Sequence, residues 1–285
     1  MEVKVTIVNA FTQNGTGGNP AAIVTDAGRF TSAQKQQIAK QVGLSETAFI
    51  SDSDAADFKF EFFTPTRQIA HCGHATIAAF AHLKQQGKIT GDRSSKETID
   101  GNRQIIFIGE KPFMEQLAPK FTAPDPEDVR LIEKSLGLSK TDLAHPISIV
   151  NTGNSFLIVP LKKAQTLQNL EPDFETIHQL SEQYNLIGYY AFATDTDYDA
   201  TARMFAPLYG IEEESATGMA AGPLACYLYE FVQPGHRYVI EQGRFMKAPS
   251  ASLIEVELEL NQGQIGSLMA GGNATFASEQ WIRID

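Results

Sequence analysis

The sequence predicts an α+β fold made of two similar halves, each with a curled β-sheet around one buried helix. Residues 75–83 and 219–228 are apolar with almost no polar face, and such a helix is buried on all sides. Several other segments, such as residues 3–9 and 58–63, alternate apolar and polar side chains, as strands do. A sheet that curls around a central helix buries it completely and explains both patterns.

Three short motifs occur twice, in the same order. Residues 18–24 and 153–159 both join a Gly-Asn pair to an apolar run, and residues 63–65 and 205–207 both read Phe-x-Pro. Small and polar residues precede the apolar helix in both copies. Because the order and the approximate spacing agree, we predict an internal duplication.

The length and charge narrow the class of protein. The 285 residues allow two halves, which we place at 1–120 and 121–285, with a terminal strand free to cross over. A formal net charge of −11 argues against nucleic acid and anionic membranes as partners, because both require basic patches. Two cysteines without a disulfide pattern indicate a reducing compartment. We see no signal peptide and no apolar run near the roughly 18 residues that span a bilayer, so we expect a cytoplasmic protein.

Local signals place the remaining elements. A helix is expected over residues 31–42, capped by Thr31 or Ser32 and ended by Gly43. Residues 13–20 are predicted to form a loop and not a phosphate cradle, because no Lys-Ser/Thr pair and no helix follow. Residues 87–104 are polar and are predicted to be turns. Further helices are expected at 126–136 and 173–184, and further strands at 21–24, 44–50, 104–108, 147–150, 154–161, 187–193, 201–205, 238–241, 253–260 and 271–276.

The starts of the two apolar helices are candidate anion sites. The first turn of a helix has unpaired backbone N–H groups and the positive end of the helix dipole. At the first helix, Gly73 lets a ligand approach the backbone closely, and His74 can carry a proton. Thr217 and Gly218 hold the corresponding positions at the second helix. Each start can therefore bind a carboxylate or an enolate.

Several motifs along the chain match those of a known family in their order: Asn9-Ala10-Phe11, Gly18-Asn19-Pro20-Ala21-Ala22-Ile23-Val24, Ser45-Glu46-Thr47-Ala48-Phe49, Phe63-Thr64-Pro65, Cys72-Gly73-His74-Ala75-Thr76, Phe205-Ala206-Pro207 and Thr217-Gly218. Together they resemble the phenazine-biosynthesis PhzF-like isomerase family over nearly the whole chain. The resemblance implies the diaminopimelate epimerase-like fold, with a cleft between the halves. It also implies an isomerase that moves a proton on a small carboxylate substrate without a metal or an organic cofactor, and a homodimer.

The same resemblance assigns the site residues. Glu46 matches the family's proton-carrying glutamate, and His74 matches its site histidine. The family's second motif usually reads Glu-Asp-Pro-x-Thr-Gly-Ser, whereas this chain reads Glu213-Glu214-Ser215-Ala216-Thr217-Gly218-Met219. Glu214 therefore stands in place of a site aspartate, and Met219, which has no donor, in place of a site serine. The candidate catalytic residues are Glu46, His74 and Glu214, and the candidate substrate-binding residues are Cys72, Gly73, Ser215, Thr217, Gly218 and Met219.

Two other functions stay open, and the substrate and pathway are not identified. Related cofactor-independent epimerases use two cysteines ahead of the paired helices, and here Cys72 holds the first position but Ser215 the second. An amino-acid or hydroxy-acid epimerase or dehydratase that uses Cys72 is therefore one alternative. The departures at Glu214 and Met219 motivate the other, a catalytically silent binder of a small anion. No metal is predicted, because His71 and a second histidine three residues later form no further ligand pattern.

Overall fold

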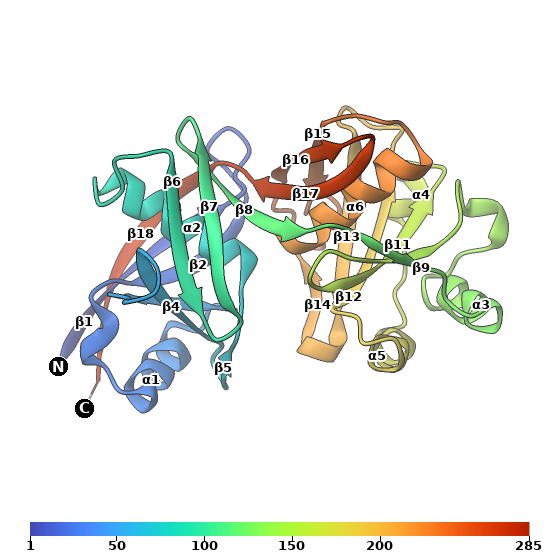
Figure 1. The fold of residues 1–285 in the computed structure, drawn as a ribbon. Helices are drawn as coiled ribbons and strands as arrows, with labels where there is room; N and C mark the ends of the chain where they lie inside the picture. Colours follow the sequence, from blue (N-terminus) through green and yellow to red (C-terminus); the bar gives the residue numbers. More distant parts are fainter. Residues whose placement is uncertain (285) are drawn as a thin grey trace. The chain divides into compact units, whose positions relative to one another are not determined.

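The computed structural model describes residues 1–284, which divide into two compact units. Unit 1 contains Met1–Glu115 and the segment from Gly271 onward, and unit 2 contains Gln116–Ala270. The last strand, β18 (Ala274–Arg283), lies antiparallel to the first, β1 (Glu2–Ala10), so unit 1 is built from both ends of the chain (Figure 1). Within the described residues, no helix is both long and apolar enough to span a bilayer.

The elements alternate between strands and a small number of helices. Unit 1 contains, besides β1 and β18, β2 (Asn19–Val24), α1 (Ser32–Val42), β3 (Thr47–Ser51), β4 (Phe58–Phe63), β5 (Gln68–Ile69), α2 (Gly73–Gln85), β6 (Arg93–Thr98), β7 (Gly101–Ile108) and most of β8 (Lys111–Leu117). Unit 2 contains β9 (Lys120–Thr122), α3 (Pro126–Ser135), β10 (Ser148–Asn151), β11 (Ser155–Leu161), α4 (Ala164–Gln168), α5 (Phe174–Gln183), β12 (Gly188–Ala193), β13 (Ala200–Ala206), β14 (Ile211–Glu214), α6 (Gly218–Phe231), β15 (Arg237–Gln242), β16 (Ser252–Asn261) and most of β17 (Gln264–Gly271).

The strands of the two units pair in the same succession. In unit 1 the neighbours run β18, β1, β2, β3, β4, β6 and β7, and in unit 2 they run β9, β10, β11, β12, β13, β15 and β16. In both successions the third strand lies parallel to the fourth and the fifth lies parallel to the sixth, while all other neighbours are antiparallel. This agreement confirms the predicted duplication.

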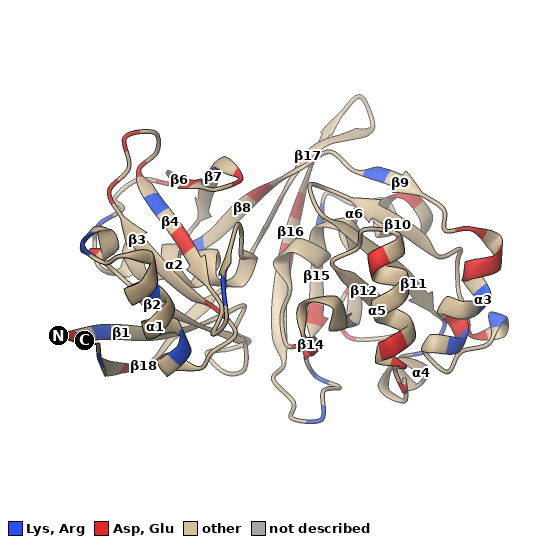
Figure 2. Ribbon diagram, turned by 90° about the horizontal axis from the view of Figure 1, so that it is seen from below, with Lys and Arg blue, Asp and Glu red and all other residues tan. Residues whose placement is uncertain are grey.

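Each unit has one long helix packed against its sheet, as the sequence predicted. α2 contacts β1, β2, β3 and β18, and α6 contacts β10, β11, β15 and β16. Both helices are drawn almost wholly in tan in Figure 2, because charged residues are absent from most of their length. Most residues of both helices are buried. The strands curl around these helices, and the predicted α+β fold is confirmed.

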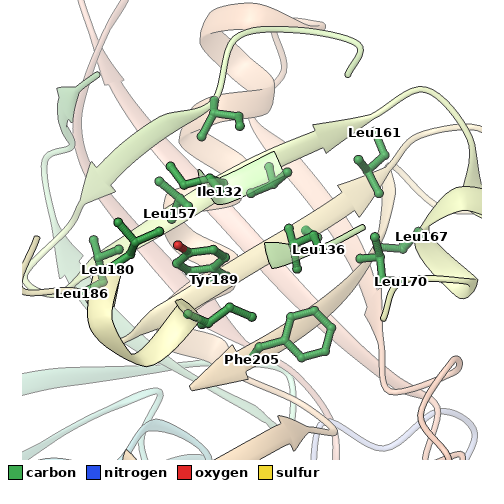
Figure 3. Packing of buried hydrophobic residues seen from close by; sticks show 14 of the residues in the cluster. Ile132, Leu136, Leu157, Leu161, Leu167, Leu170, Leu180, Leu186, Tyr189 and Phe205 are labelled. Atoms are coloured by element: carbon green, nitrogen blue, oxygen red, sulfur yellow. The ribbon is translucent and has the colours of Figure 1, made fainter. Parts of the chain in front are cut away.

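Unit 2 has a second apolar layer on the opposite face of its sheet. Leu157 and Val159 of β11 pack with side chains of the outer helices, including Ile132 of α3 and Leu180 of α5 (Figure 3). Phe156 and Ile158 are equally buried, and successive side chains of a strand point to opposite faces. After its first residue, Ser155, this strand is therefore apolar throughout, because both of its faces are covered.

Local signals predicted α1 well, but the polar stretch at residues 87–104 was interpreted wrongly. Thr31 caps α1 and forms a reciprocal capping box with Gln34, and Gly43 ends the helix with a φ of 72°. Residues 87–104 contain β6 and the first half of β7, which form an antiparallel hairpin. The buried positions of β6 are Ser94, Lys96 and Thr98, so its inward face is polar and shows no apolar alternation.

Candidate active site

Three buried side chains of unit 1 meet at the start of α2. Glu46 comes one residue before β3, Cys72 is the N-cap of α2, and His74 is the second residue of the helix. A carboxylate oxygen, a sulfur and an imidazole nitrogen of these residues lie within 4.8 Å of one another. The structure thus brings together three of the residues singled out from the sequence, across 28 positions of the chain (74 − 46).

His74 lies between the other two groups and turns a different ring nitrogen to each. Its Nδ1 is 3.6 Å from Cys72 Sγ, and its Nε2 is 3.2 Å from Glu46 Oε2. The alignment of Nε2 and Oε2 falls short of a hydrogen bond, so we treat this contact as an electrostatic one within reach of proton transfer. An imidazole can accept a proton on one nitrogen and donate from the other. The arrangement can therefore exchange protons among the carboxylate, the imidazole and the thiol.

These residues also form a set of possible metal ligands, since a carboxylate, an imidazole and a thiol can each bind a transition metal. The ring of His74, however, presents Nδ1 to Cys72 and Nε2 to Glu46. One ion cannot be bound through both nitrogens of a single ring. In this orientation the geometry suits proton transfer better than a shared ion.

Burial controls the protonation of the thiol. Loss of solvent raises the pKa of Cys72 above its ordinary value; His74 opposes this shift and the negative charge of Glu46 adds to it. Cys72 is therefore a protonated thiol at neutral pH, able to donate but weak as a base. The other cysteine, Cys226, is buried inside α6, where burial raises its pKa to about 12. Both cysteines are free, and Cys226 is part of the core.

Burial and a side-chain hydrogen bond hold the backbone at the start of α2 in place. Gly73 is the first residue of the helix and is buried. The Thr76 hydroxyl donates a hydrogen bond of 2.6 Å to the carbonyl oxygen of Cys72. Cys72 makes no side-chain cap, so its thiol is available to His74. The positive end of the helix dipole thus lies beside the Glu46 and His74 pair.

Unit 2 has a second group of candidate residues at the start of α6. Thr217 is the N-cap of α6, and its hydroxyl donates a hydrogen bond of 2.5 Å to Glu214 Oε2. Gly218 begins the helix, and its carbonyl oxygen accepts from the Gln116 amide at 2.9 Å. Ser215, which lies between Glu214 and Thr217 in the sequence, is buried. The structure thus joins Glu214 directly to the helix start.

Gln242 organises this group, and sequence reasoning missed its role. Its side-chain oxygen accepts from the hydroxyl of Tyr190 at 2.8 Å and from the backbone N–H of Thr217 at 3.0 Å. Its amide nitrogen donates to the carbonyl of Glu214 at 2.7 Å and to Thr217 Oγ1 at 3.1 Å. Gln242 is fully buried, so all four bonds lie in a region of low dielectric. Its place directly after a predicted strand, before a glycine, is a signal that the sequence holds.

The three consecutive glutamates of β14 have different surroundings. Arg203, which is 7% exposed, holds both carboxylate oxygens of Glu213 at 2.8 and 2.9 Å. Its Nη1 also donates to the carbonyls of Leu167, Gln168 and Leu170. Glu213 is therefore a structural anchor, whereas Glu214 bonds the helix start, and Glu212 is exposed.

Met219 stands one residue into α6 and is half-buried. The side-chain amide of Asn154 approaches its sulfur at 3.6 Å. A thioether accepts weakly and donates nothing. The start of α6 therefore has no hydroxyl at the position where the resembled family has a serine.

The fold defines a class of protein, those with a diaminopimelate epimerase-like architecture. The same fold is seen in a hydroxyproline epimerase from Agrobacterium vitis, with a TM-score of 0.62 at 11% identity over 99% of this chain and 92% of that one. The family model described as "Phenazine biosynthesis-like protein", PhzC-PhzF, matches residues 8–279. The chain belongs to this family and is an isomerase.

Individual relatives agree with this assignment. An uncharacterised isomerase of Clostridium acetobutylicum is 33% identical and covers 95% of this chain and 96% of its own length. The trans-2,3-dihydro-3-hydroxyanthranilate isomerase of Pseudomonas chlororaphis is 30% identical, and the match covers 90% of this chain and 91% of that protein. A PhzF-family protein of Bacillus anthracis superimposes with a TM-score of 0.89 at 27% identity over the whole of both chains.

Proposed function

We propose that this protein moves a proton between carbon atoms of a small carboxylate substrate, with Glu46 as the acid and base and without a cofactor. The observation that carries the proposal is the buried Glu46 carboxylate, 3.2 Å from the imidazole of His74 at the start of α2. Proton transfer from carbon needs a base held out of bulk water, close to the reacting atom. Glu46 meets that requirement in unit 1.

The proposed step needs no electron acceptor. The Glu46 carboxylate takes a proton from one carbon of the substrate, and the C–H electron pair moves into the adjoining unsaturated system. The resulting carboxylic acid, whose proton exchanges with water during the lifetime of the intermediate, then protonates a different carbon, and a double bond has moved. The backbone N–H groups of α2 and the imidazole of His74 stabilise the negative charge that develops in between.

The unit 2 group is proposed as a second anion-binding site. Thr217 and Gly218 present the start of α6, where a carboxylate would be stabilised by the helix dipole. Glu214, with Thr217 as its hydrogen-bond partner, is the proposed second acidic group. Met219 supplies no donor, so we propose that backbone N–H groups at the start of α6, without a side-chain hydroxyl at that position, bind the carboxylate.

The test is deuterium exchange on a candidate substrate. trans-2,3-Dihydro-3-hydroxyanthranilate is incubated with the protein in deuterated water, and incorporation at carbon is followed by NMR. The wild-type protein is expected to catalyse exchange, and Glu46→Gln to reduce its rate at least a hundredfold, because an amide cannot take the proton. Glu241→Gln is the control, since Glu241 is also buried but bonds Thr201 instead.

Retention of exchange in Glu46→Gln would remove Glu46 from its proposed role. Absence of exchange in the wild-type protein, with binding of the same compound detected by calorimetry, would favour the silent anion binder. A matching loss in Glu241→Gln would show that the effect is on folding and not on the proton carrier.

An epimerase that uses Cys72 is the second candidate, supported by the 3.6 Å contact between its sulfur and His74 Nδ1. In that reaction the thiol would carry the proton. Cys72→Ala then separates the two candidates in the same exchange assay. Under the leading proposal this variant keeps exchange within about tenfold of wild type, whereas under the second it loses activity as severely as Glu46→Gln.

A further inference from the structure

A lysine lies buried behind the start of α2, and the proposed reaction makes no use of it. Lys96, in the middle of β6, is fully buried. Its ammonium nitrogen lies 5.0 Å from the ring centroid of Phe62 and 5.9 Å from that of Phe60. A lysine is almost never buried so completely without specific partners, because its charge loses its hydration.

Two hydrogen bonds connect Lys96 to the segment that enters α2. Its Nζ donates to Thr76 Oγ1 at 2.6 Å. The hydrogen of that hydroxyl is already used in the bond to the Cys72 carbonyl, so the oxygen of Thr76 must be the acceptor. Lys96, Thr76 and Cys72 therefore form one chain of hydrogen bonds.

The second bond reaches His71. Lys96 Nζ lies 3.3 Å from His71 Nδ1. Burial holds the pKa of His71 well below its ordinary value, and the nearby charges of Lys96 and Arg103 lower it further. His71 is thus neutral at pH 7, and its Nδ1 accepts from the ammonium. The two bonds of Lys96 hold the backbone on both sides of Cys72.

We propose that Lys96 is a positioning residue for the reaction of Glu46 and His74. Its ammonium holds the first turn of α2 through Thr76 and His71, and it adds positive charge to the end of α2 where an anionic substrate would bind. This inference rests on the proposed function. Lys96 would act on the reaction through the start of α2 and would not touch a reacting atom.

The charge of Lys96 is adjustable near neutral pH. Burial, together with a smaller effect of Arg103, lowers the pKa of Lys96 to about 7, while Cys72 and Asp100 oppose the shift. Together with His71, these are the titratable groups that face it from β7, the adjoining turn and the segment before α2. A lysine whose pKa is lowered carries its charge below that pKa and loses it above. The affinity for an anionic substrate should therefore fall as the pH rises through about 7.

The kinetic test compares two variants with a buried control. Lys96→Met removes the charge and both bonds, while Lys96→Gln removes the charge and can still donate. At pH 6 both are expected to lower kcat/KM for the exchange substrate about tenfold, mainly by raising KM. Both should also lose the inflection near pH 7 that the wild type shows. Lys35→Met is the control, because Lys35 is a buried lysine of the same unit that pairs with Glu61 instead.

A second measurement does not depend on the reaction. In protein labelled with ¹³C at the lysine ε position, the Lys96 signal is assigned in the wild type from its nuclear Overhauser contacts with the rings of Phe60 and Phe62. We expect it to titrate with a midpoint near 7, and the backbone amide signals of Cys72, Gly73 and His74 to shift with the same midpoint. Because the wild-type protein is observed, this measurement decides the matter even if neither variant folds.

Two results would overturn the inference. One is titration of Lys96 at the ordinary value for a lysine, or amide signals of the α2 start that do not follow it. The other is a kinetic profile in folded Lys96→Met and Lys96→Gln that matches the wild type. Absence of exchange in the wild type would instead count against the proposed function, while the NMR titration would still report on Lys96.

Discussion

At the scale of single residues, burial decides which groups at the start of α2 carry protons. Cys72 is a thiol because loss of solvent raises its pKa, and Lys96 is only partly charged at neutral pH because the same effect lowers its pKa to about 7. Burial disfavours the charged form in both cases, so acids and bases shift in opposite directions.

The reactivity of Cys72 gives a prediction at this scale. In a Cys226→Ser background a single thiol remains, and only its thiolate reacts with iodoacetamide. Because the pKa of Cys72 is raised, the alkylation rate should keep increasing above about pH 10, where the rate of an unperturbed thiol has levelled off. Glu46→Gln should move the pH–rate curve to lower pH, since Glu46 contributes to raising the pKa. Mass spectrometry of quenched samples measures the rate.

A curve that levels off near pH 7 would contradict this prediction. It would mean that Cys72 is a thiolate at neutral pH, as the epimerase alternative requires. The dependence on pH is the informative quantity, because burial slows the reaction at every pH.

At the scale of elements, close approach of the backbone fixes how β15 meets the start of α6. Gly243 follows β15 with a φ of +82°, and an added Cβ would lie 2.2 Å from the carbonyl oxygen of Ser250 and 2.7 Å from that of Ser215. Both contacts are with backbone atoms, which cannot turn aside. Gly243 therefore lets the end of β15 approach the chain that leads into α6, and Gln242 gains its reach to Thr217.

A matched pair of glycines tests this reading. Gly263 has a φ of +80° but has open space where a Cβ would be. Gly263→Ala should cost about 1 kcal/mol, the strain of the left-handed conformation alone. Gly243→Ala should cost about 2–4 kcal/mol, because a steric clash adds to the same strain. Urea unfolding of the two variants gives the difference, and equal free energies of unfolding would show that the close contact is relaxed at little cost.

At the scale of the whole molecule, unit 1 depends on a strand from the far end of the chain. β18 pairs with β1 from Glu2 opposite Arg283 to Ala10 opposite Ala274. Unit 2 is continuous, and its apolar layer beneath α3, α4 and α5 comes from its own residues. The two units therefore differ in what they need from the rest of the chain.

Truncation after Ala270 should unfold unit 1 and leave unit 2 folded. The truncated chain lacks β18, so β1 loses one of its two partners and the apolar contacts around Ile282. Unit 2 keeps its core and lies within the usual size of an independent domain. Limited proteolysis with mass spectrometry should show cleavage within Met1–Glu115 and protection of Gln116–Ala270. Trp281→Ala is the control, because its side chain is 66% exposed and the strand remains.

Protection of both units after truncation would contradict this expectation. Cleavage in both would show that unit 2 depends on unit 1.

The sequence by itself determined the elements that have local or periodic signals. α1 was predictable from Thr31 and Gly43, because caps are local interactions. The two central helices were predictable because a helix buried on all sides must be apolar on all sides. The duplication was predictable because the motifs recur in order, and Glu46 and His74 were identified through motifs that resemble those of a family.

Only the tertiary structure decided where the polar residues lie. Lys96 and Gln242 belong to segments whose composition does not distinguish them from surface residues. Both are buried because partners distant in sequence satisfy their hydrogen bonds, Thr76 and His71 for one and Thr217 and Tyr190 for the other. Hydrophobicity is a property of each residue, and the spacing of apolar residues along the chain can be recognised in the sequence. The satisfaction of a buried polar group depends on which strands and helices become neighbours, and that is established only when the chain folds.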